Sequence, residues 1–421
     1  MKISDFRRYA LSWCAGVAML AGCAGVAMLA DCGGSTPLSP LSAGVKEERT
    51  HARPSYSELY SFEGSPGDGA YPYARLNNVN GTLYGTTSYG GAQCFSSYGC
   101  GTVFSITTSG TEKLLYSFGK GGSNDGADPT DDLIAVAGTL YGTTSAGGAH
   151  DDGTVFAMTL SGEEKVLHGF KGSPDGFDPF AGLINVKGTL YGTTEYAGAN
   201  GAGTVFAVTT SGKEAVLYSF AGAPDGADPY ARLIDVNGTL YGTTYYGGSP
   251  GCYSDLGCGT VFSITTSGKE RVVHSFGAGT DGENPFADLI NVNGTLYGTT
   301  SGGGANGDGT VFAITTSGKE SVLYSFKGRP DGANPHGGLL NVNGTLYGTT
   351  LGGGAHCAKH RGCGTVFSIT TSGAETVLHS FRGSGGGRNP GAGLIDVNGT
   401  LYGTTLEGGA SDDGTVFSLA P

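Results

Sequence analysis

The sequence predicts an all-β fold, a seven-bladed β-propeller with four antiparallel strands in each blade, closed by the N-terminal strand. Three observations lead to this prediction. The heptapeptide GTLYGTT occurs seven times, beginning at Gly81, Gly138, Gly188, Gly238, Gly294, Gly344 and Gly399. Successive copies lie 50 to 57 residues apart, a spacing typical of repeat architectures. Each unit also contains four short β-prone segments, which is the strand content of one propeller blade.

The unit at residues 233–276 shows how the four strands follow one another. LIDV and TLYGTT flank Asn237-Gly238, a pair typical of tight hairpin turns because both residues accept positive φ. After a variable Gly-rich loop, GTVFSITT leads through a second tight turn, Ser267-Gly268, into KERVVHSF. We name these four strands a, b, c and d in chain order.

The number of strands predicts how the ring closes. Strands a, b and c occur seven times, whereas strand d follows only the first six c strands. A matching segment, ELYSF at 58–62, lies before the first unit. We expect it to pair with the last c strand and complete the seventh blade, because closure removes exposed sheet edges. The propeller then spans residues 57–421 as one domain.

The strands of the repeat are apolar on both sides. Large apolar residues alternate onto both faces of strands c and d, which predicts sheets that are covered on both faces. A glycine stands at the same place in the middle of every b strand, as at Gly85, Gly142 and Gly192. We expect a neighbouring sheet to approach closely at these glycines.

The first 32 residues resemble an export leader. Lys2, Arg7 and Arg8 precede a short apolar run, as in a signal peptide. The run ends in LAGC, which resembles the bacterial lipobox, so Cys23 is the acylation candidate and Cys32 the alternative. An uncleaved membrane anchor is a further alternative, because residues 9–30 are long enough to span a bilayer. Residues 33–56 then form a flexible linker rich in Ser, Pro and Gly.

The cysteines outside the leader form three regular pairs in the b–c loops. They are Cys94 with Cys100, Cys252 with Cys258, and Cys357 with Cys363. This regularity predicts three local disulfides and an oxidising compartment. A pair of cysteines alone supplies only two metal ligands, so we prefer disulfides to a metal site. The net charge of −13 argues against nucleic-acid or anionic-membrane partners.

The complete unit, GTLYGTT…GG…GTVFxITTSGxExVLYSF, resembles the GloVer repeat family over residues 57–421. This resemblance implies an exported, anchored bacterial repeat protein, and it supplies no catalytic residues to transfer. The last unit departs from the pattern at Leu419, where ITTSG would continue. That departure agrees with closure by the N-terminal strand.

The candidate functional face carries the b–c loops and the d–a connections, because these segments hold most of the variation between units. We call it the loop face. Just before each strand a, seven positions should surround the mouth of the central channel, and the charged ones are the ligand candidates Arg75, Asp132, Arg232 and Asp288. Irregularly placed b–c loop tyrosines are further candidates: Tyr89, Tyr98, Tyr196, Tyr245, Tyr246 and Tyr253.

A ring residue follows the proline of the d–a connection in five units, as Tyr73, Phe180, Tyr230, Phe286 and His336. These rings could form an aromatic rim that holds a glycan. Because the position recurs, we favour a packing role between adjacent blades.

Other motifs are interpreted as structural. The DGxD/N pairs, such as Asp225 with Asp228, lack the dense oxygen ligands of a calcium loop and fit backbone-capping turns. His168, His274 and His379 replace the tyrosine of VLYSF and are interpreted as strand residues. We find no catalytic signature and expect no metal and no cofactor.

We expect a monomeric, exported, surface-anchored module that binds a glycan or a protein and reaches the membrane only through its N-terminal lipid. The alternative is an exported carbohydrate-active enzyme, a hydrolase or lyase, with Asp132 and Asp288 as acid and base. These two residues are three units apart, so we expect them to lie too far from each other for glycoside chemistry. A passive spacer or adhesion module is a third possibility.

Overall fold

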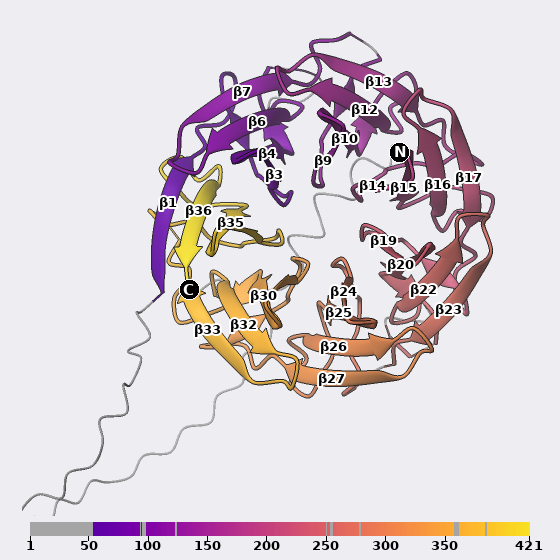
Figure 1. The fold of residues 1–421 in the computed structure, drawn as a ribbon, viewed down its shortest axis with the longest axis vertical. Coiled ribbons are helices and arrows are strands. Elements are labelled where there is room, and N and C mark those ends of the chain that lie inside the picture. Colours follow the sequence, from indigo (N-terminus) through magenta and orange to yellow (C-terminus); the bar gives the residue numbers. More distant parts are fainter. Residues whose placement is uncertain are drawn as a thin grey trace, which may run out of the picture. The chain divides into compact units, whose positions relative to one another are not determined.

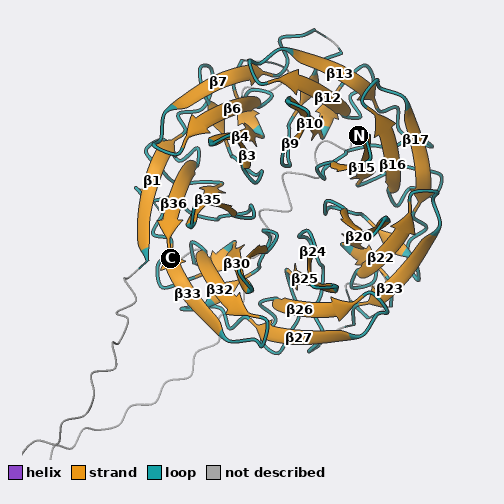
Figure 2. Cartoon of the chain, viewed as in Figure 1, coloured by secondary structure: helices purple, strands orange, loops and turns teal. Residues whose placement is uncertain are grey.

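The computed structural model describes residues 54–421, apart from residues 93, 95–97, 123, 250, 253–255, 278, 358–361 and 384. Over this range the chain forms seven four-stranded antiparallel sheets arranged around a central axis (Figure 1). Figure 2 shows strands and loops only, and the described residues contain no helix. We also find, within this part of the chain, no helix with the length and hydropathy of a membrane span. The predicted seven-bladed β-propeller is confirmed.

Each blade is built from strands a to d, with a innermost and d outermost (Figure 1). The a strands are β3 (Asn77–Val79), β9 (Ile134–Val136), β14 (Ile184–Val186), β19 (Ile234–Val236), β24 (Ile290–Val292), β29 (Leu340–Val342) and β34 (Ile395–Val397). The b strands are β4 (Thr82–Thr87), β10 (Thr139–Thr144), β15 (Thr189–Thr194), β20 (Thr239–Thr244), β25 (Thr295–Thr300), β30 (Thr345–Thr350) and β35 (Thr400–Thr405). The c strands are β6 (Thr102–Thr107), β12 (Thr154–Thr159), β16 (Thr204–Thr209), β22 (Thr260–Thr265), β26 (Thr310–Thr315), β32 (Thr365–Thr370) and β36 (Thr415–Ala420). The d strands are β7 (Glu112–Ser117), β13 (Glu164–Gly169), β17 (Glu214–Ser219), β23 (Glu270–Ser275), β27 (Glu320–Ser325), β33 (Glu375–Ser380) and β1 (Ser55–Ser61). We number the blades 1 to 7 in the order of their a strands.

Short ladders tie the d–a connection of each blade to its b–c loop, a feature that the sequence analysis did not anticipate. Four blades use two-residue strands: β2 (Gly69–Ala70) with β5 (Tyr89–Gly90), β8 (Gly126–Ala127) with β11 (Ala146–Gly147), β18 (Gly226–Ala227) with β21 (Tyr246–Gly247), and β28 (Gly332–Ala333) with β31 (Gly352–Gly353). The other three use single bridges: Phe177 with Tyr196, Glu283 with Gly302, and Arg388 with Glu407. The loop face is therefore a hydrogen-bonded surface rather than a set of independent loops.

The N-terminal strand closes the ring as the sequence predicts. β1 pairs antiparallel with β36, from Ser55 opposite Ala420 to Ser61 opposite Thr415. The resulting sheet has the order β1-β36-β35-β34, so blade 7 takes its outer strand from the opposite end of the chain. The strand begins three residues earlier than the expected segment 58–62 and ends one residue earlier.

The core lies between the blades and consists of repeated phenylalanine contacts. At each junction, the phenylalanine after strand d of one blade meets the phenylalanine of strand c in the next blade, edge to face. The pairs and their ring-centroid distances are Phe62–Phe104 (5.1 Å), Phe118–Phe156 (5.3 Å), Phe170–Phe206 (5.1 Å), Phe220–Phe262 (5.0 Å), Phe276–Phe312 (5.1 Å), Phe326–Phe367 (5.1 Å) and Phe381–Phe417 (5.2 Å). All of these rings are buried, so the interfaces between blades supply most of the apolar burial.

The mid-strand glycines serve these phenylalanines, and the reason differs from the expected one. Gly85 lies directly across from Phe104 of its own blade. A Cβ at Gly85 would lie 2.6 Å from Cζ of Phe104 and 2.9 Å from Cδ2 of Leu76. The expected close approach of a neighbouring sheet is therefore wrong: the ring that fills this space belongs to the same blade.

Six of the outer junctions between blades contain a side-chain triad. A tyrosine or histidine of one d strand, an aspartate of the following connection and a glutamate at the start of the next d strand come together there. The four tyrosine triads are Tyr60–Asp68–Glu112, Tyr116–Asp125–Glu164, Tyr218–Asp225–Glu270 and Tyr324–Asp331–Glu375. In each, the tyrosine hydroxyl donates to the aspartate, at 2.8 to 3.1 Å. Most of these aspartates also accept backbone N–H groups, as expected for turn-capping residues; Asp68, for example, accepts from Glu63 N at 2.8 Å.

The junction between blades 6 and 7 has a different composition. Tyr56 occupies the glutamate position and Gly386 the aspartate position, opposite His379. The ring of Tyr56 stacks on His379, with centroids 4.1 Å apart and planes 6° apart. The Tyr56 hydroxyl donates to the carbonyl oxygen of Gly386 at 2.8 Å. This junction is held by ring contacts instead of a pair of acids.

The three cysteine pairs lie at disulfide-bonding distance. The Cα atoms are 5.9 Å apart for Cys94 and Cys100, 5.1 Å for Cys252 and Cys258, and 5.5 Å for Cys357 and Cys363. These separations are typical of disulfides. Each bridge closes a b–c loop on the loop face.

We predict that removing residues 55–61 abolishes cooperative unfolding, because β36 would lose its partner and the ring would open. Urea unfolding followed by circular dichroism should give a broad transition at much lower urea than for the full chain. Deletion of residues 33–39 in the predicted linker is the length-matched control and should leave the transition unchanged. Equal midpoints for the full chain and the strand deletion would contradict closure.

We also predict that stability falls as the pH rises from about 5 to 8. Burial, together with Asp68 beside Glu112 and Asp331 beside Glu375, raises the pKa of both glutamates to about 7, although the Tyr60 and Tyr324 hydroxyls and Lys327 act in the opposite direction. The unfolded chain releases these protons near pH 4.3. Between these values the folded state binds more protons, so its stability declines with increasing pH.

The matching variant is Glu112→Gln, which removes one such titration. Its melting temperature should exceed that of the wild type at pH 8 and approach it at pH 5. Glu163→Gln, at an exposed turn, is the control and should follow the wild type at every pH. A Glu112→Gln effect of the same size at both pH values would refute the explanation.

Candidate functional site

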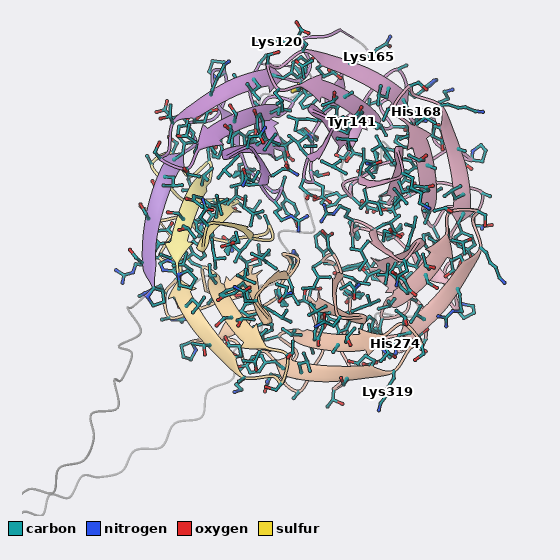
Figure 3. All side chains as sticks on the ribbon, viewed as in Figure 1. Lys120, Tyr141, Lys165, His168, His274 and Lys319 are labelled. Carbon is teal, nitrogen blue, oxygen red and sulfur yellow. A yellow bond between two sulfur atoms is a disulfide. The ribbon has the colours of Figure 1, made fainter. Side chains whose placement is uncertain are left out.

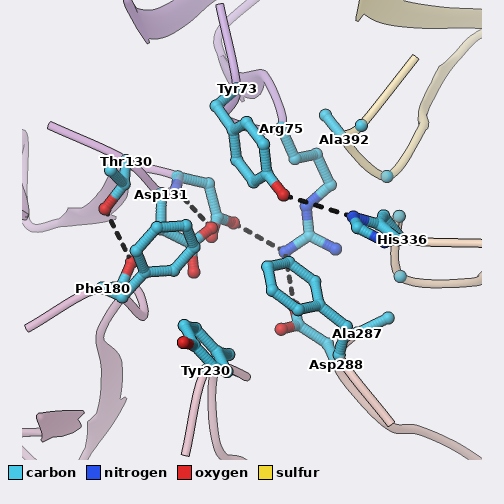
Figure 4. Close-up of a pocket in the computed structure, with 16 residues that line it drawn as sticks. Tyr73, Arg75, Thr130, Asp131, Phe180, Tyr230, Ala287, Asp288, His336 and Ala392 are labelled. Atoms are coloured by element: carbon cyan, nitrogen blue, oxygen red, sulfur yellow. Dashed lines mark hydrogen bonds and ion pairs between the residues drawn. The ribbon is translucent and has the colours of Figure 1, made fainter. Parts of the chain in front are cut away.

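The candidate site lies on the axis, where the d–a connections enter the a strands. The chain turns after the proline that recurs in each unit and reaches strand a five residues later. The first and third side chains after the proline, such as Tyr73 and Arg75, converge on the axis (Figure 4). Two layers result. The residue after the proline forms an aromatic layer, and the residue two positions later, nearer to strand a, forms a charged layer.

The charged layer brings together all four charged candidates of the sequence analysis in one ion-pair network. Asp132 Oδ2 lies 2.6 Å from Arg75 Nη2 and 3.0 Å from Arg232 Nη1. Asp288 Oδ2 lies 3.8 Å from Arg75 Nη2 and 3.3 Å from Arg232 Nη2. Asp288 Oδ1 also accepts the backbone N–H of Arg232 at 2.9 Å. Blades 1, 2, 4 and 5 are thus connected across the axis.

This network fixes the charge state of its members. Burial alone would raise the pKa of the Asp132 carboxyl, but the guanidinium groups of Arg232 and Arg75 hold it below its usual value. Burial likewise opposes the charge of Arg75, yet Asp132 and Asp288 raise its pKa above the usual value. The Asp132 carboxylate and the Arg75 guanidinium therefore remain ionised.

The expectation that Asp132 and Asp288 lie too far apart is wrong. Their Oδ2 atoms lie 2.6 and 3.8 Å from the same Arg75 nitrogen, so their separation cannot exceed the sum of these distances. The two carboxylates are therefore no farther apart than the carboxylate pairs of glycoside hydrolases can be. The number of intervening blades does not indicate the distance between two residues here, because side chains on the axis of a narrow ring lie close together whichever blades they come from.

Asp131 is a site residue that the sequence analysis missed. Its Oδ1 accepts the N–H of Asp132 at 2.7 Å, and its Oδ2 accepts the N–H of Gly182 at 2.5 Å, which links blade 2 to blade 3. Burial and the neighbouring Asp132 carboxylate raise the pKa of Asp131 well above its usual value. The Asp-Asp pair in this unit was a signal in the sequence, since the other units have one acid or none at these two positions.

The aromatic layer packs between adjacent blades, as expected, and its rings also meet across the axis. Phe286 is its centre: it stacks on Tyr230 at 5.0 Å and on His336 at 4.6 Å, and meets Phe180 at 5.9 Å and Tyr73 at 6.3 Å. Burial lowers the pKa of His336 to about 4, so its imidazole is neutral at physiological pH. The favoured packing role holds, but the rings plug the central channel.

The channel is consequently almost filled. The space bounded by the two layers has a volume of about 40 Å³, which holds a few water molecules but no sugar ring. A ligand larger than water does not fit into this space, so on the axis it would have to lie on the aromatic layer, on the loop face. The arginines and aspartates below it are occupied by each other.

Two b–c loop tyrosines extend the aromatic layer outward over blades 4 and 5. Tyr245 meets Tyr230 at 5.4 Å and Phe286 at 6.2 Å, and Tyr246 meets Tyr245 at 4.7 Å. All four rings are partly exposed. Together they form a continuous aromatic surface, which we call the blade-4 patch.

The remaining tyrosine candidates lie in other places. Tyr196 on blade 3 stacks with Phe177 at 6.0 Å and is 36% exposed. Tyr89 on blade 1 contacts Tyr98, which is 65% exposed. Tyr253 lies outside the described residues, as do the acylation candidates Cys23 and Cys32.

Glu195 is a second residue that the sequence analysis missed. It is 5% exposed and accepts a hydrogen bond from the Tyr230 hydroxyl. Burial, with a contribution from Asp178, raises its pKa to about 8, so this carboxyl is protonated at neutral pH. A neutral carboxyl beside the blade-4 patch can both donate and accept hydrogen bonds.

Comparison with known proteins identifies the family of the chain. A family model described as the Gloeobacter/Verrucomicrobia repeat matches residues 48–254, 92–295 and 253–421, and the chain belongs to this family. No curated protein sequence matches it.

Solved structures show the same fold at low sequence identity. A virginiamycin B lyase from Staphylococcus aureus is 13% identical with a TM-score of 0.56, and the match covers 88% of this chain and 99% of the lyase. A streptogramin B lyase is 14% identical, also with a TM-score of 0.56, and covers 87% of this chain and 97% of its own. Identities this low establish a shared fold only.

We predict that Arg232→Met lowers the free energy of unfolding by about 3 kcal/mol, because it leaves buried carboxylates short of a partner. Arg388→Met is the control: Arg388 pairs with Glu407 and Asp412 at 2.7 and 2.9 Å in a more exposed place, so its loss should cost about 1 kcal/mol or less. Urea unfolding at neutral pH measures both. Equal losses would show that the network on the axis contributes nothing beyond a surface ion pair.

Proposed function

We propose that this Gloeobacter/Verrucomicrobia repeat protein is an exported, surface-anchored binding protein whose ligand is a glycan held on the loop face. The observation that carries the proposal is the blade-4 patch, a partly exposed surface formed by Tyr230, Tyr245, Tyr246 and Phe286. Aromatic side chains offer large contact areas at little cost in conformational entropy.

The surroundings of the patch favour a sugar over a charged ligand. The C–H faces of a pyranose ring are apolar and pack on flat aromatic rings, whereas its hydroxyl groups need hydrogen-bonding partners. The tyrosine hydroxyls on the patch supply such partners, and the buried carboxyl of Glu195 holds the Tyr230 hydroxyl in place. The arginines and aspartates of the axis neutralise each other, so the floor of the site offers no net charge.

Export and anchoring rest on the leader and the cysteines. The basic and apolar segments before residue 33 support secretion, and acylation at Cys23, or at Cys32, would attach the protein to a membrane. Three cysteine pairs at disulfide distance support an oxidising compartment.

The alternative of a carbohydrate-active enzyme has weaker support. The spacing of Asp132 and Asp288 permits a catalytic pair, but the Asp132 side chain is 3% exposed and both carboxylates are bound to guanidinium groups. An acid catalyst needs a raised pKa and access to the leaving group. Neither condition is met by Asp132.

We predict that the full-length protein binds at least one polysaccharide class on a glycan array, and that Tyr245→Ala with Tyr246→Ala weakens this binding about tenfold or more. Two lost ring contacts justify this magnitude. Isothermal titration calorimetry with the best array ligand measures it. Tyr245→Phe should retain most of the affinity, because stacking needs the ring and not the hydroxyl.

Leu256→Ala is the matched control, since Leu256 is 53% exposed on the same b–c loop but is not aromatic. Its affinity should equal that of the wild type. If no glycan on the array binds and a protein partner is captured instead, the ligand is a protein and not a glycan. If the protein converts the array ligand into hydrolysis or elimination products, and the Asp288→Asn variant does not, the result favours the enzyme alternative.

A further inference from the structure

Two of the six outer triads contain histidine in place of tyrosine. The first, between blades 2 and 3, consists of His168 on β13, Asp175 in the following connection and Glu214 on β17. His168 Nε2 lies 3.2 Å from Asp175 Oδ2. One ligand atom from each of the three residues lies within 4.8 Å of the other two. Figure 3 shows His168 at the outer edge of the ring.

The second histidine triad, between blades 4 and 5, repeats this arrangement. His274 Nε2 on β23 lies 3.4 Å from Asp281 Oδ2, and Glu320 on β27 completes the group within the same 4.8 Å limit. In Figure 3, His274 is labelled on the same right-hand side of the ring, below His168. His274 Nε2, Asp281 Oδ1 and Glu320 Oε1 are buried atoms that make no hydrogen bond. Each of the three side chains therefore carries a buried polar atom without a hydrogen bond, while Asp281 Oδ2 accepts the backbone N–H of Gly277 at 2.8 Å.

The distances fit a metal ion. Two ligand atoms that each lie about 2.1 Å from one ion, at an angle of about 90–110°, are separated by about 3.0–3.4 Å. The observed histidine–aspartate distances of 3.2 and 3.4 Å match this edge length. We expect a rotation of the glutamate side chain to bring one oxygen to the ion, because the three ligand atoms already lie within 4.8 Å of one another.

The four tyrosine triads can be compared with the two histidine triads, because the two kinds differ only in the ring residue on strand d. They have the same aspartate and glutamate, and their glutamate Oε1 atoms, such as those of Glu112 and Glu270, also lack hydrogen bonds. There, however, the tyrosine hydroxyl donates a hydrogen bond to the aspartate, as Tyr218 does to Asp225 at 2.9 Å. A phenol stays protonated near neutral pH and is a poor ligand, whereas a neutral imidazole offers a lone pair.

We propose that the two histidine triads each bind one divalent transition-metal ion, with Zn²⁺ as the reference, through the imidazole and the two carboxylates. Water completes the coordination. The ion joins the outer strands of neighbouring blades, β13 to β17 and β23 to β27. The sequence alone does not indicate these sites, because the three ligands come from segments that look ordinary when each is read alone.

The choice of metal follows from the ligands. One nitrogen and two carboxylate oxygens suit Zn²⁺, Mn²⁺ or Co²⁺, while Ca²⁺ and Mg²⁺ prefer oxygen ligands alone. Lys171 adds positive charge near Glu214, whereas Asp281 and His274 are the charged neighbours that act on Glu320 within the described part of the chain. The His274 site should therefore bind the ion more tightly than the His168 site.

The repeats supply substitutions that the fold already accepts. His168→Tyr and His274→Tyr convert each histidine triad into the tyrosine triad found at four sister junctions, and Tyr218→His does the reverse. The full chain, produced without a histidine tag, is equilibrated by dialysis with micromolar Zn²⁺, and bound zinc is measured by mass spectrometry. Comparing variants cancels binding by other histidines and by cysteines.

We predict two more bound ions per chain in the wild type than in the double variant His168→Tyr/His274→Tyr. Each single variant should lose one ion, and Tyr218→His should gain one. With Co²⁺, the visible absorption bands of a nitrogen–oxygen site should change in the same steps. Identical zinc content in the wild type and the double variant would overturn the proposal. A single variant that retains its full zinc content would overturn it for that junction.

Discussion

The structure depends on the contact between two phenylalanine rings at every junction of the ring. An edge-to-face pair joins strand d of one blade to strand c of the next, with centroids 5.0 to 5.3 Å apart. The strand c ring can reach this position only because the residue across from it on strand b is glycine, where a Cβ would lie 2.5 to 2.8 Å from the ring. Because this packing repeats at all seven junctions around the axis, β1 lies beside β36 and pairs with it. The phenylalanine contact between two blades thus requires the glycine on strand b, and the two features together form one constraint.

The packing between blades also determines which residues can lie on the central axis. The a strands have three residues each and leave a narrow centre, into which the d–a connections project. Seven identical charged residues there would repel one another, so strict repetition is impossible at this position. The sequence instead places two arginines, two aspartates and three glycines before the a strands. The arginines and aspartates neutralise each other, and the glycines leave them room. Departure from the repeat on the axis is therefore a requirement of the fold, and function has to be sought above the plug.

The fold could be predicted from the sequence because it depends on local signals that recur. The Asn-Gly turns, the four short strands, the paired cysteines and the displaced strand at 58–62 are each visible within one unit. The distance between Asp132 and Asp288 could not be predicted, because it depends on the inner radius of the ring and not on the number of units between them. The prediction for Gly85 was wrong for a related reason. The recurring glycine in strand b indicates that space is needed beside it, but it does not indicate which ring fills that space. The outer triads escaped notice because a strand histidine, a turn aspartate and a strand glutamate are unremarkable until three segments meet.

The junction between blades 6 and 7, where the ring closes, differs in composition from the other junctions. Blade 7 is completed by a strand from the far end of the chain, so closing it costs more chain entropy than docking a neighbouring strand. A buried acid pair there would add a desolvation penalty to that cost. Among the junctions that the structure describes, this one alone replaces both acids, with Tyr56 and Gly386, and gains a stacked ring pair at 4.1 Å. Because a neutral aromatic contact needs no partner charge and no bound ion, the ring can close whatever occupies the other junctions.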